Sequence, residues 1–275
     1  MDCFGLQASF GNGSEKVTTG EAASQLMFFP ARIDWLKYST PQAGFHLAGG
    51  LVPWFFALAA LLFVLGVGVG LCIAPASERQ GDIARIVVLH VPAAWTALVI
   101  YLSIAFWAVV GLVLNTRLSF MMGHALAPTG ALFALLALIT GALWGKPASG
   151  SWWTWDARLT SELILFFLYI GYIALHSAID DTRRADRASA VLILIGAINL
   201  PVLYFSVLWW NASHRGIPLA LPDVADMAPL TIAATLLAAA GLWAYGVAAS
   251  LLRLRCIALE RERDADWALD YAAGQ

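Results

Sequence analysis

Four tryptophans fall within one short run of the chain, between Trp144 and Glu162. The run reads W-G-K-P-A-S-G-S-W-W-T-W-D-A-R-L-T-S-E and carries basic and acidic side chains among the aromatic ones. Glycine and proline recur in it and interrupt regular structure, so the sequence predicts a loop over residues 144–162. Indole rings offer flat apolar surfaces for stacking. A loop this aromatic suits a flat, apolar ligand, whose contacts would come from Trp144, Trp152, Trp153 and Trp155.

The composition places this loop in a membrane protein. Of the 275 residues, 60% are hydrophobic and only 12% are charged, whereas about 25% of the residues of a soluble domain are charged. A net charge of −2 gives no support for nucleic-acid binding. The three cysteines form neither a C-x-x-C pair nor the C-x-x-C-H pattern of covalent haem attachment. The chain is therefore not itself a c-type cytochrome.

Six apolar segments are each close to the length of about 20 residues that crosses a bilayer. In lipid, only helices and closed barrels satisfy all backbone polar groups, and runs of this length indicate helices. The sequence thus predicts an all-α, polytopic membrane protein with six transmembrane helices. The predicted spans are residues 51–74, 92–114, 125–143, 163–179, 188–210 and 228–252.

Prolines and glycines within the spans predict local features. Pro92 is expected in the first turn of the second span, where its missing N–H costs nothing. Pro201 should kink the fifth span and free a carbonyl. In the first span, Gly66, Gly68 and Gly70 would allow a close approach of another helix.

The basic residues predict the orientation of the spans. Eleven of the 16 lysines and arginines lie before the first span, after the second and fourth spans, and after the last. By the positive-inside rule these segments are cytoplasmic, which leaves the tryptophan loop on the outer face. The predicted organisation is a cytoplasmic segment over 1–50, a membrane domain over 51–252 and a cytoplasmic tail over 253–275. Residues 1–26 are expected to be disordered or to precede the true start.

The histidines divide between the two faces. His46, His124 and His176 fall on the predicted cytoplasmic side and are expected to be ordinary interfacial residues. His90 and His214 fall on the outer side, in the loops before and after the tryptophan loop. We therefore expect one histidine from each neighbouring loop to lie near the tryptophans.

This combination suits haem, a flat apolar disc with two axial positions on its iron and two propionates. Imidazole nitrogen is an established haem-iron ligand, and arginine binds carboxylates in a bidentate manner. Asp156 is expected to orient Arg158 or to cap the fourth helix rather than to touch iron. An interfacial belt of tryptophans with structural histidines remains an open alternative at this point. The candidates for propionate contacts are Arg158, Lys146, Arg85 and Arg215.

The string W-G-K-P…W-W-T-W-D-A-R-L-T-S-E-L-I-L-F-F-L-Y resembles the WWD signature of membrane haem-handling proteins. The chain reads R-I-V-V-L-H-V-P-A-A-W around His90 and V-L-W-W-N-A-S-H-R-G around His214. From about residue 53 to residue 255 it is similar to the haem exporter protein C family, CcmC, of the bacterial cytochrome c maturation system. The stretch W-D-A-R-L-T-S-E distinguishes it from larger haem-lyase relatives.

The resemblance implies a haem site on the periplasmic side of the bacterial inner membrane. Haem b would bind non-covalently and transiently, with His90 and His214 as axial ligands and with the WWD positions extending from Trp144 to Asp156. The family's role implies an ABC-type complex with CcmA, CcmB and CcmD, and delivery of haem to the chaperone CcmE. The chain lacks the G-x-x-x-x-G-K-S/T motif, so a partner would hydrolyse ATP. No nucleophile–base pair is evident, and the expected role is not enzymatic.

Three alternatives make different demands on the chain. A haem lyase, which attaches haem directly to apocytochrome c, predicts an extra soluble domain or further helices. A carrier that moves haem through its own helices needs polar groups at mid-membrane, where Asn199 is the main candidate. An electron-transfer cytochrome b needs histidine pairs within helices, whereas these histidines are predicted at helix ends.

Overall fold

The computed structural model describes residues 40–75, 81–209 and 228–274. His214 and Arg215, which the sequence singled out, lie outside the described residues. The helical elements in chain order are α1 (Pro41–Gly68), η2 (Val69–Ile73), η3 (Asp82–Ile86), α2 (Val87–Leu114), α3 (Arg117–Ser149), α4 (Ala157–Ala178), α5 (Thr182–Gly196), α6 (Asn199–Trp209), α8 (Pro229–Arg261) and α9 (Asp266–Ala273).

Six helical stretches among these residues are long and apolar enough to cross a membrane, which confirms the predicted all-α, six-helix class. These helical stretches extend beyond the apolar segments from which the spans were predicted. The first begins at Pro41 rather than at 51, and the last continues to Arg261 rather than 252. Apolar composition marks only the part of a helix that faces lipid, whereas the helix itself ends at its caps.

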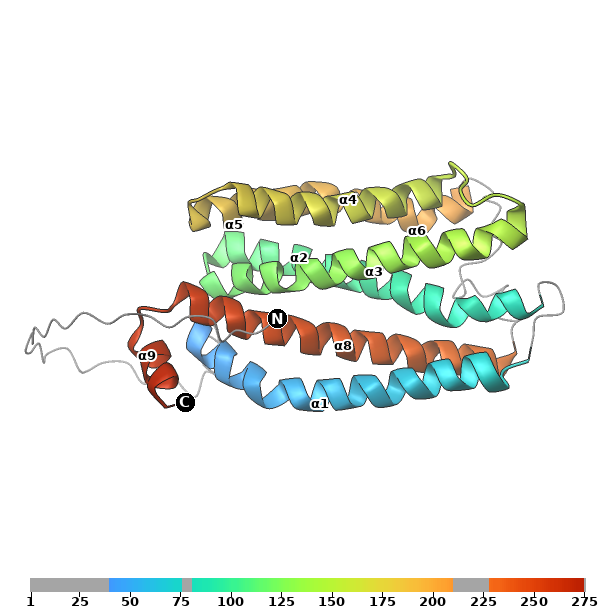
Figure 1. Ribbon diagram of the computed structural model, residues 1–275. Coiled ribbons are helices and arrows are strands. Elements are labelled where there is room, and N and C mark those ends of the chain that lie inside the picture. The colour runs from blue at the N-terminus through green and yellow to red at the C-terminus, as the bar shows by residue number, and fades with distance from the viewer. Residues whose placement is uncertain (1–39, 76–80, 210–227, 275) are drawn as a thin grey trace, which may run out of the picture.

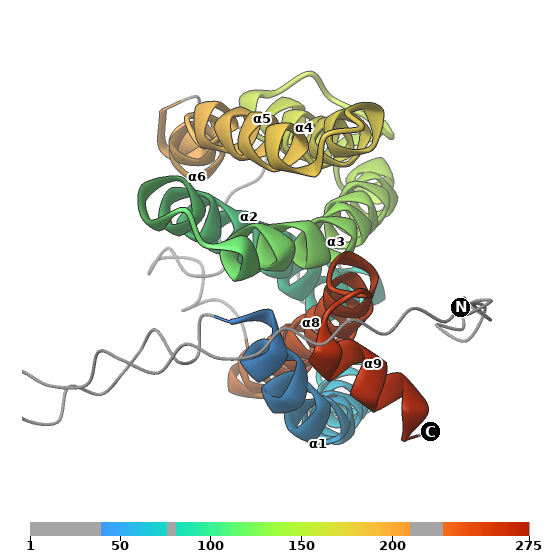
Figure 2. The ribbon, with the colours of Figure 1, turned by 90° about the vertical axis from the view of Figure 1, so that its left-hand side faces the viewer.

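The helices form three layers (Figures 1 and 2). The upper layer holds α4, α5 and α6, the middle layer holds α2 and α3, and the lower layer holds α1 and α8. Helix α8 contacts α2 and α3 as well as α1, and so joins the lower and middle layers. The helices run side by side, and their ends therefore gather at the two ends of the bundle.

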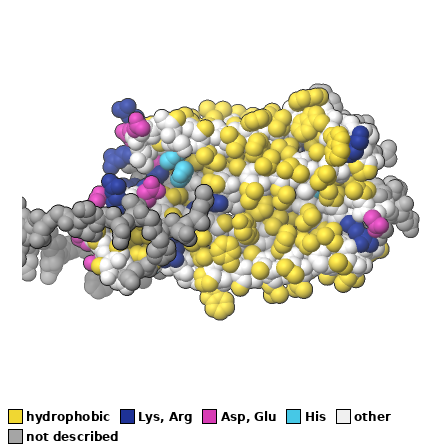
Figure 3. Space-filling view, viewed as in Figure 1, with side chains coloured by type: hydrophobic (Ala, Val, Ile, Leu, Met, Phe, Trp, Pro, Cys, Tyr) yellow, Lys and Arg dark blue, Asp and Glu magenta, His cyan; other side chains and the backbone are white. Residues whose placement is uncertain are grey.

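We name these two ends by what they carry. The tryptophan end, on the right in Figure 1, includes the loop from 150 to 156, the end of α1 and the starts of α2, α4 and α8. The charged end, on the left, includes the starts of α1, α3 and α5, the ends of α4 and α8, and helix α9. Figure 3 shows charged side chains gathered mainly at the charged end, with an apolar surface between the two ends.

Small residues bring α1 and α8 into close contact. A Cβ added to Gly66 would lie 2.4 Å from the backbone nitrogen of Ala238, and one added to Gly241 would lie 2.6 Å from that of Phe63. Gly70 similarly lies against the side chain of Val88, whereas a Cβ on Gly68 would meet nothing within 4 Å. The predicted close approach is confirmed at the first and third glycines of the run and not at the second.

The two prolines behave differently from each other. The prediction for Pro92 was wrong, because α2 begins at Val87 and the proline lies buried inside the helix. At Pro201 the predicted interruption is confirmed, since the fifth span divides into α5 and α6 at residues 197–198. The carbonyl of Ala197, which proline cannot engage, accepts a hydrogen bond from the backbone N–H of Leu200 at 3.1 Å.

Candidate functional site

The tryptophan loop is shorter than predicted. Helix α3 continues to Ser149 and α4 begins at Ala157, so residues 150–156 form the connection. The prediction of a loop over 144–162 was therefore wrong at both ends. Gly150 ends α3 in the left-handed conformation, with φ at 81°, as is common for a glycine just after a helix. Gly145 and Pro147 lie within the last two turns and do not end the helix earlier.

His90 is placed on α2, where the bundle interior meets the tryptophan end. Its side chain is buried, with 7% of its surface exposed. The ring atom Nδ1 lies 3.2 Å from the carbonyl oxygen of Ala137 and 3.1 Å from Thr140 Oγ1, both on α3. A carbonyl oxygen only accepts, so Nδ1 carries the proton and Nε2 carries the lone pair of the neutral ring. That tautomer presents Nε2 as a metal-ligating atom, oriented by contacts on the other nitrogen.

Trp144 is the tryptophan of the run that lies beside this histidine. The two rings meet edge to face, with their centroids 5.8 Å apart. Because α3 continues through residue 149, Trp144 projects from a helix and not from a flexible connection. Helix α3 thus provides both the hydrogen-bond acceptors for His90 and an indole at its side.

The other three tryptophans lie in the connection itself. Trp152 and Trp155 are 57% and 79% exposed, and the rings of Trp153 and Trp155 pack edge to face at 5.5 Å. Trp153 Nε1 is buried and has no hydrogen-bond partner within the described part of the chain. Large exposed indoles beside an unsatisfied donor are unusual in a connector, since buried polar atoms are normally paired.

Asp156 caps α4, one of the two roles expected for it. Its Oδ1 accepts a hydrogen bond from the backbone N–H of Leu159 at 2.8 Å, and its Oδ2 accepts one from the hydroxyl of Thr154 at 3.2 Å. The first bond satisfies one of the free N–H groups that begin a helix. The aspartate therefore fixes where the tryptophan connection ends and α4 begins.

A groove of about 590 Å³ opens between the start of α4 and helix α6. Asn199 joins the two helices there, since its side-chain Nδ2 donates to the carbonyl oxygen of Ser161 at 2.8 Å. This role of Asn199 depends on how α6 lies against α4, which the sequence does not show. The remaining lining residues are mostly apolar: Trp155, Ala157, Ile164, Ile198 and Val202, with Asp156 and Thr160.

Two of the three described basic candidates have contacts within the protein. Arg85 Nη1 donates to the carbonyl of Leu71, and Arg85 Nε lies 3.3 Å from Asp82 Oδ1. Lys146 Nζ donates to the carbonyl of Gly150 at 3.0 Å and lies 5.9 Å from the centroid of the Trp152 ring. Arg158 is half-buried in the first turn of α4. The structure thus brings Lys146 to the tryptophan connection, and Arg85 joins η3 to η2.

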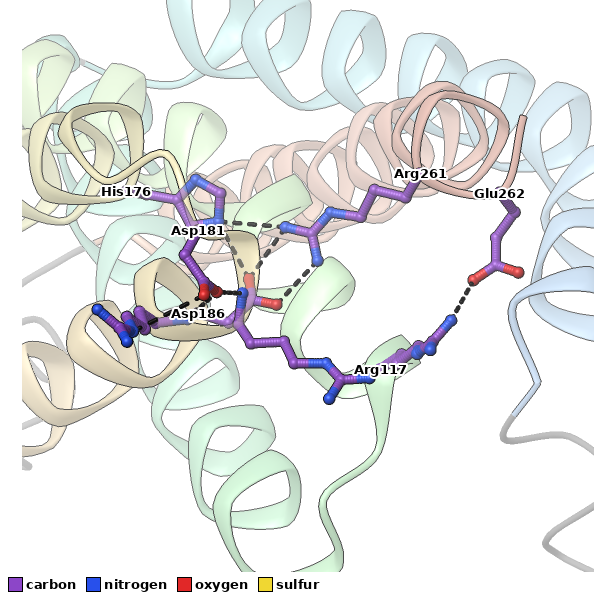
Figure 4. A network of polar contacts seen from close by, with 8 residues as sticks. Arg117, His176, Asp181, Asp186, Arg261 and Glu262 are labelled. Atoms are coloured by element: carbon purple, nitrogen blue, oxygen red, sulfur yellow. Dashed lines mark hydrogen bonds and ion pairs between the residues drawn. The ribbon is translucent and has the colours of Figure 1, made fainter. Parts of the chain in front are cut away.

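The charged end holds a polar network that the sequence did not predict (Figure 4). Asp186 Oδ1 and Oδ2 each accept a hydrogen bond from Arg261 at 2.9 Å, and Oδ1 lies 3.0 Å from His176 Nε2. The ring of His176 stacks on that of His124, with their centroids 4.0 Å apart. Together these contacts join α3, α4, α5 and α8, so His124 and His176 are parts of a structural network.

The fold and these contacts define a polytopic, six-helix membrane protein with an aromatic connection and an oriented histidine at one end. The family model described as Heme exporter protein C, CcmC, matches residues 34–269 of this chain. The chain belongs to the haem exporter protein C family.

Curated relatives of that name show the same likeness. The protein of Escherichia coli (strain K12) is 46% identical over 180 residues, which cover 66% of this chain and 74% of the relative. That of Haemophilus influenzae is 38% identical over 234 residues, covering 85% of this chain and 95% of the relative. That of Paracoccus denitrificans is 36% identical over 220 residues, or 80% and 91% of the two chains.

Proposed function

We propose that the protein binds haem at its tryptophan end and delivers it for the maturation of c-type cytochromes. The observation that carries this proposal is the setting of His90. Its Nδ1 is held by Ala137 and Thr140, so that Nε2 is the nitrogen that would ligate the iron, and Trp144 lies against the ring. Membership of a family named for haem export supports haem as the ligand.

The iron would be held by two imidazoles, from His90 and His214. The second histidine follows α6, which ends at the tryptophan end, and precedes α8, which begins there. Two axial ligands fill both open positions of the iron and limit its reactions with oxygen and peroxide. The affinity must stay moderate, because the haem is cargo that is passed on.

The tryptophan connection would contact the haem ring. The exposed rings of Trp152 and Trp155 offer flat apolar contact, and Trp153 Nε1 offers a donor that has no partner among the described residues. Arg158, Lys146, Arg85 and Arg215 are the candidates for the propionates. The fit is chemically sound, since apolar rings, cations and one unpaired donor match an apolar disc with two carboxylates. The protein's part is then to position the haem and to set its electrostatic environment.

The location and partners follow from the family resemblance and from the distribution of charge. Most lysines and arginines of the described residues lie at the charged end, which the positive-inside rule assigns to the cytoplasm. The tryptophan end then faces the periplasm from the bacterial inner membrane. The expected recipient is a CcmE-type chaperone for haem b, and CcmA, CcmB and CcmD-type subunits would complete an ABC complex that supplies ATP hydrolysis.

The test is the absorption spectrum of haem co-purified with single-histidine variants. His90→Ala and His214→Ala should each lose the low-spin spectrum of a bis-histidine haem. His46→Ala, at the charged end, is the matched control and should retain it. An unchanged low-spin spectrum in either of the first two variants would reject that histidine as a ligand. Co-purification of apocytochrome c instead of the chaperone would favour the haem-lyase alternative.

A further inference from the structure

Helix α4 carries a buried carboxylate that neither the capping contacts nor the proposed ligands use. Glu162 is 8% exposed, and its Oε1 is buried without a hydrogen-bond partner among the described residues. Its face of the helix is the interior one, shared with Leu165, Tyr169 and Tyr172. Removing an ionised group from water costs several kcal/mol unless other groups compensate. A carboxylate in this position therefore requires an explanation.

Contacts further from the tryptophan end fix how α4 lies against its neighbours. The Tyr169 hydroxyl donates to the carbonyl oxygen of Ala97 on α2 at 2.6 Å. The same ring lies so close to α3 that a Cβ on Gly130 would be 2.2 Å from it. Ala97, Gly130 and Tyr169 therefore lie at one level of the bundle, where α2, α3 and α4 meet.

His90, Ala137 and Glu162 each lie seven residues from this level, on α2, α3 and α4 in turn, in the direction of the tryptophan end. Seven residues make almost two turns, about 10.5 Å, so each residue lies on the same face as the one it is counted from. The hydrogen bond between His90 Nδ1 and the Ala137 carbonyl independently confirms that α2 and α3 keep this register. The Glu162 carboxylate thus lies inside the bundle at the level of the proposed iron ligand.

The surroundings of Gly141 show that α4 and His90 approach the same point of α3. A Cβ added to Gly141 on α3 would lie 3.2 Å from His90 Cε1 and 3.9 Å from Leu159 Cδ2. Leu159 is one turn before Glu162 on α4. Arg158, at i,i+4 spacing from Glu162, is a cation on the same helix.

We propose that Glu162 is a positioning residue that sets the charge environment of the His90-bound iron and favours ferric over ferrous haem. This inference rests on the proposed function, because it concerns the same haem. Ferric haem carries one more positive charge than ferrous haem, and a carboxylate in the low-dielectric interior attracts that charge. Glu162 need not touch the haem for this effect, which acts through space at the level of the ligand.

The size of the effect follows from the spacing of the helices. Packed helices lie about 8–10 Å apart. At that separation, and at an effective dielectric constant of about 20, one charge changes the ratio of ferric to ferrous affinity by roughly twentyfold. For a one-electron couple, a tenfold change corresponds to a shift of about 59 mV in reduction potential, so a twentyfold change corresponds to about 77 mV.

The experiment is a redox titration of haem bound to the full chain, followed by absorption. Glu162→Gln keeps the size of the side chain and removes its charge, so the reduction potential should rise by about 77 mV. Glu162→Asp keeps the charge and should stay close to the unsubstituted protein. The matched control is Asp186→Asn on α5, the same change at another buried carboxylate. Asp186 lies beside His176, which is about 21 Å from Glu162 along α4. The potential of this control should not move.

Each other outcome is informative. An unchanged or lowered potential in Glu162→Gln overturns the inference, even if haem still binds through two histidines. If glutamine prevents folding, Glu162→Leu removes the same charge and must raise the potential in the same way. The proposed function fails separately, when the unsubstituted protein binds no haem or when its spectrum does not depend on His90.

Discussion

The two ends of the bundle treat their buried carboxylates in opposite ways. At the charged end, both carboxylate oxygens of Asp186 are hydrogen-bonded, and Arg261 supplies two of the contacts. At the tryptophan end, Trp153 Nε1 and Glu162 Oε1 are buried without partners among the described residues. Hydrogen bonds to both oxygens of Asp186 hold helices together, whereas a buried carboxylate without a partner lowers stability and requires an explanation. The comparison supports the proposal that the Asp186 network fastens the bundle and that the tryptophan end receives a ligand.

The largest expected effect is at the charged end. Asp186→Asn leaves Arg261 buried without its counter-charge, and breaking a buried pair in this way costs about 3–5 kcal/mol. We expect a correspondingly lower stability in detergent, measured by denaturant unfolding, together with an unchanged haem spectrum. A changed spectrum would show that the two ends are coupled and would break the comparison.

A smaller effect is expected from the residues that orient His90. Thr140→Val removes one of the two acceptors near Nδ1 and leaves the carbonyl of Ala137. Loss of a group that orients a metal ligand typically weakens metal binding by 10–100-fold. With one acceptor kept, we expect about tenfold weaker haem binding, measured by titration of the apoprotein. Thr235→Val is the control, because that hydroxyl donates to the carbonyl of Thr231 in its own helix.

The two helix caps give a matched pair of substitutions. Asp156 caps α4 at the tryptophan end, and Asp181 caps α5 at the charged end through the N–H groups of Arg183 and Arg184. Replacement of either by alanine should cost about 1 kcal/mol of stability. Only Asp156→Ala should also weaken haem binding, since it frees the tryptophan connection. Equal haem binding by the two variants would contradict the assigned division between the ends.

The smallest effect on stability is expected at Trp155. This side chain is 79% exposed, so Trp155→Ala should change the free energy of unfolding by less than about 0.5 kcal/mol. Haem retention during purification should nevertheless fall, because the ring is a proposed contact surface. Trp54→Ala, which replaces a 76% exposed tryptophan on α1 far from the connection, is the control. Equal haem retention by the two variants would show that the exposed ring of Trp155 does not contact haem.

Local sequence signals predicted much of the fold. The length of the apolar runs gave six spans, and Pro201 marked the division between α5 and α6. A capping role for Asp156 was anticipated from its position before the fourth span. These features depend on residues close together in the chain, such as a run of apolar side chains, a missing N–H or a carboxylate one turn from a free N–H. The same local rules failed at Gly145 and Pro147, where α3 continues despite two residues that usually end a helix.

The sequence by itself determined the six spans, the aromatic run and the presence of His90 near it. Only the tertiary structure decided which nitrogen of His90 is held, that Glu162 lies at its level, and that His176, Asp186 and Arg261 meet at the other end. These relations join residues up to 85 positions apart. They depend on the rotation and register of packed helices, which the pattern within any one helix does not specify.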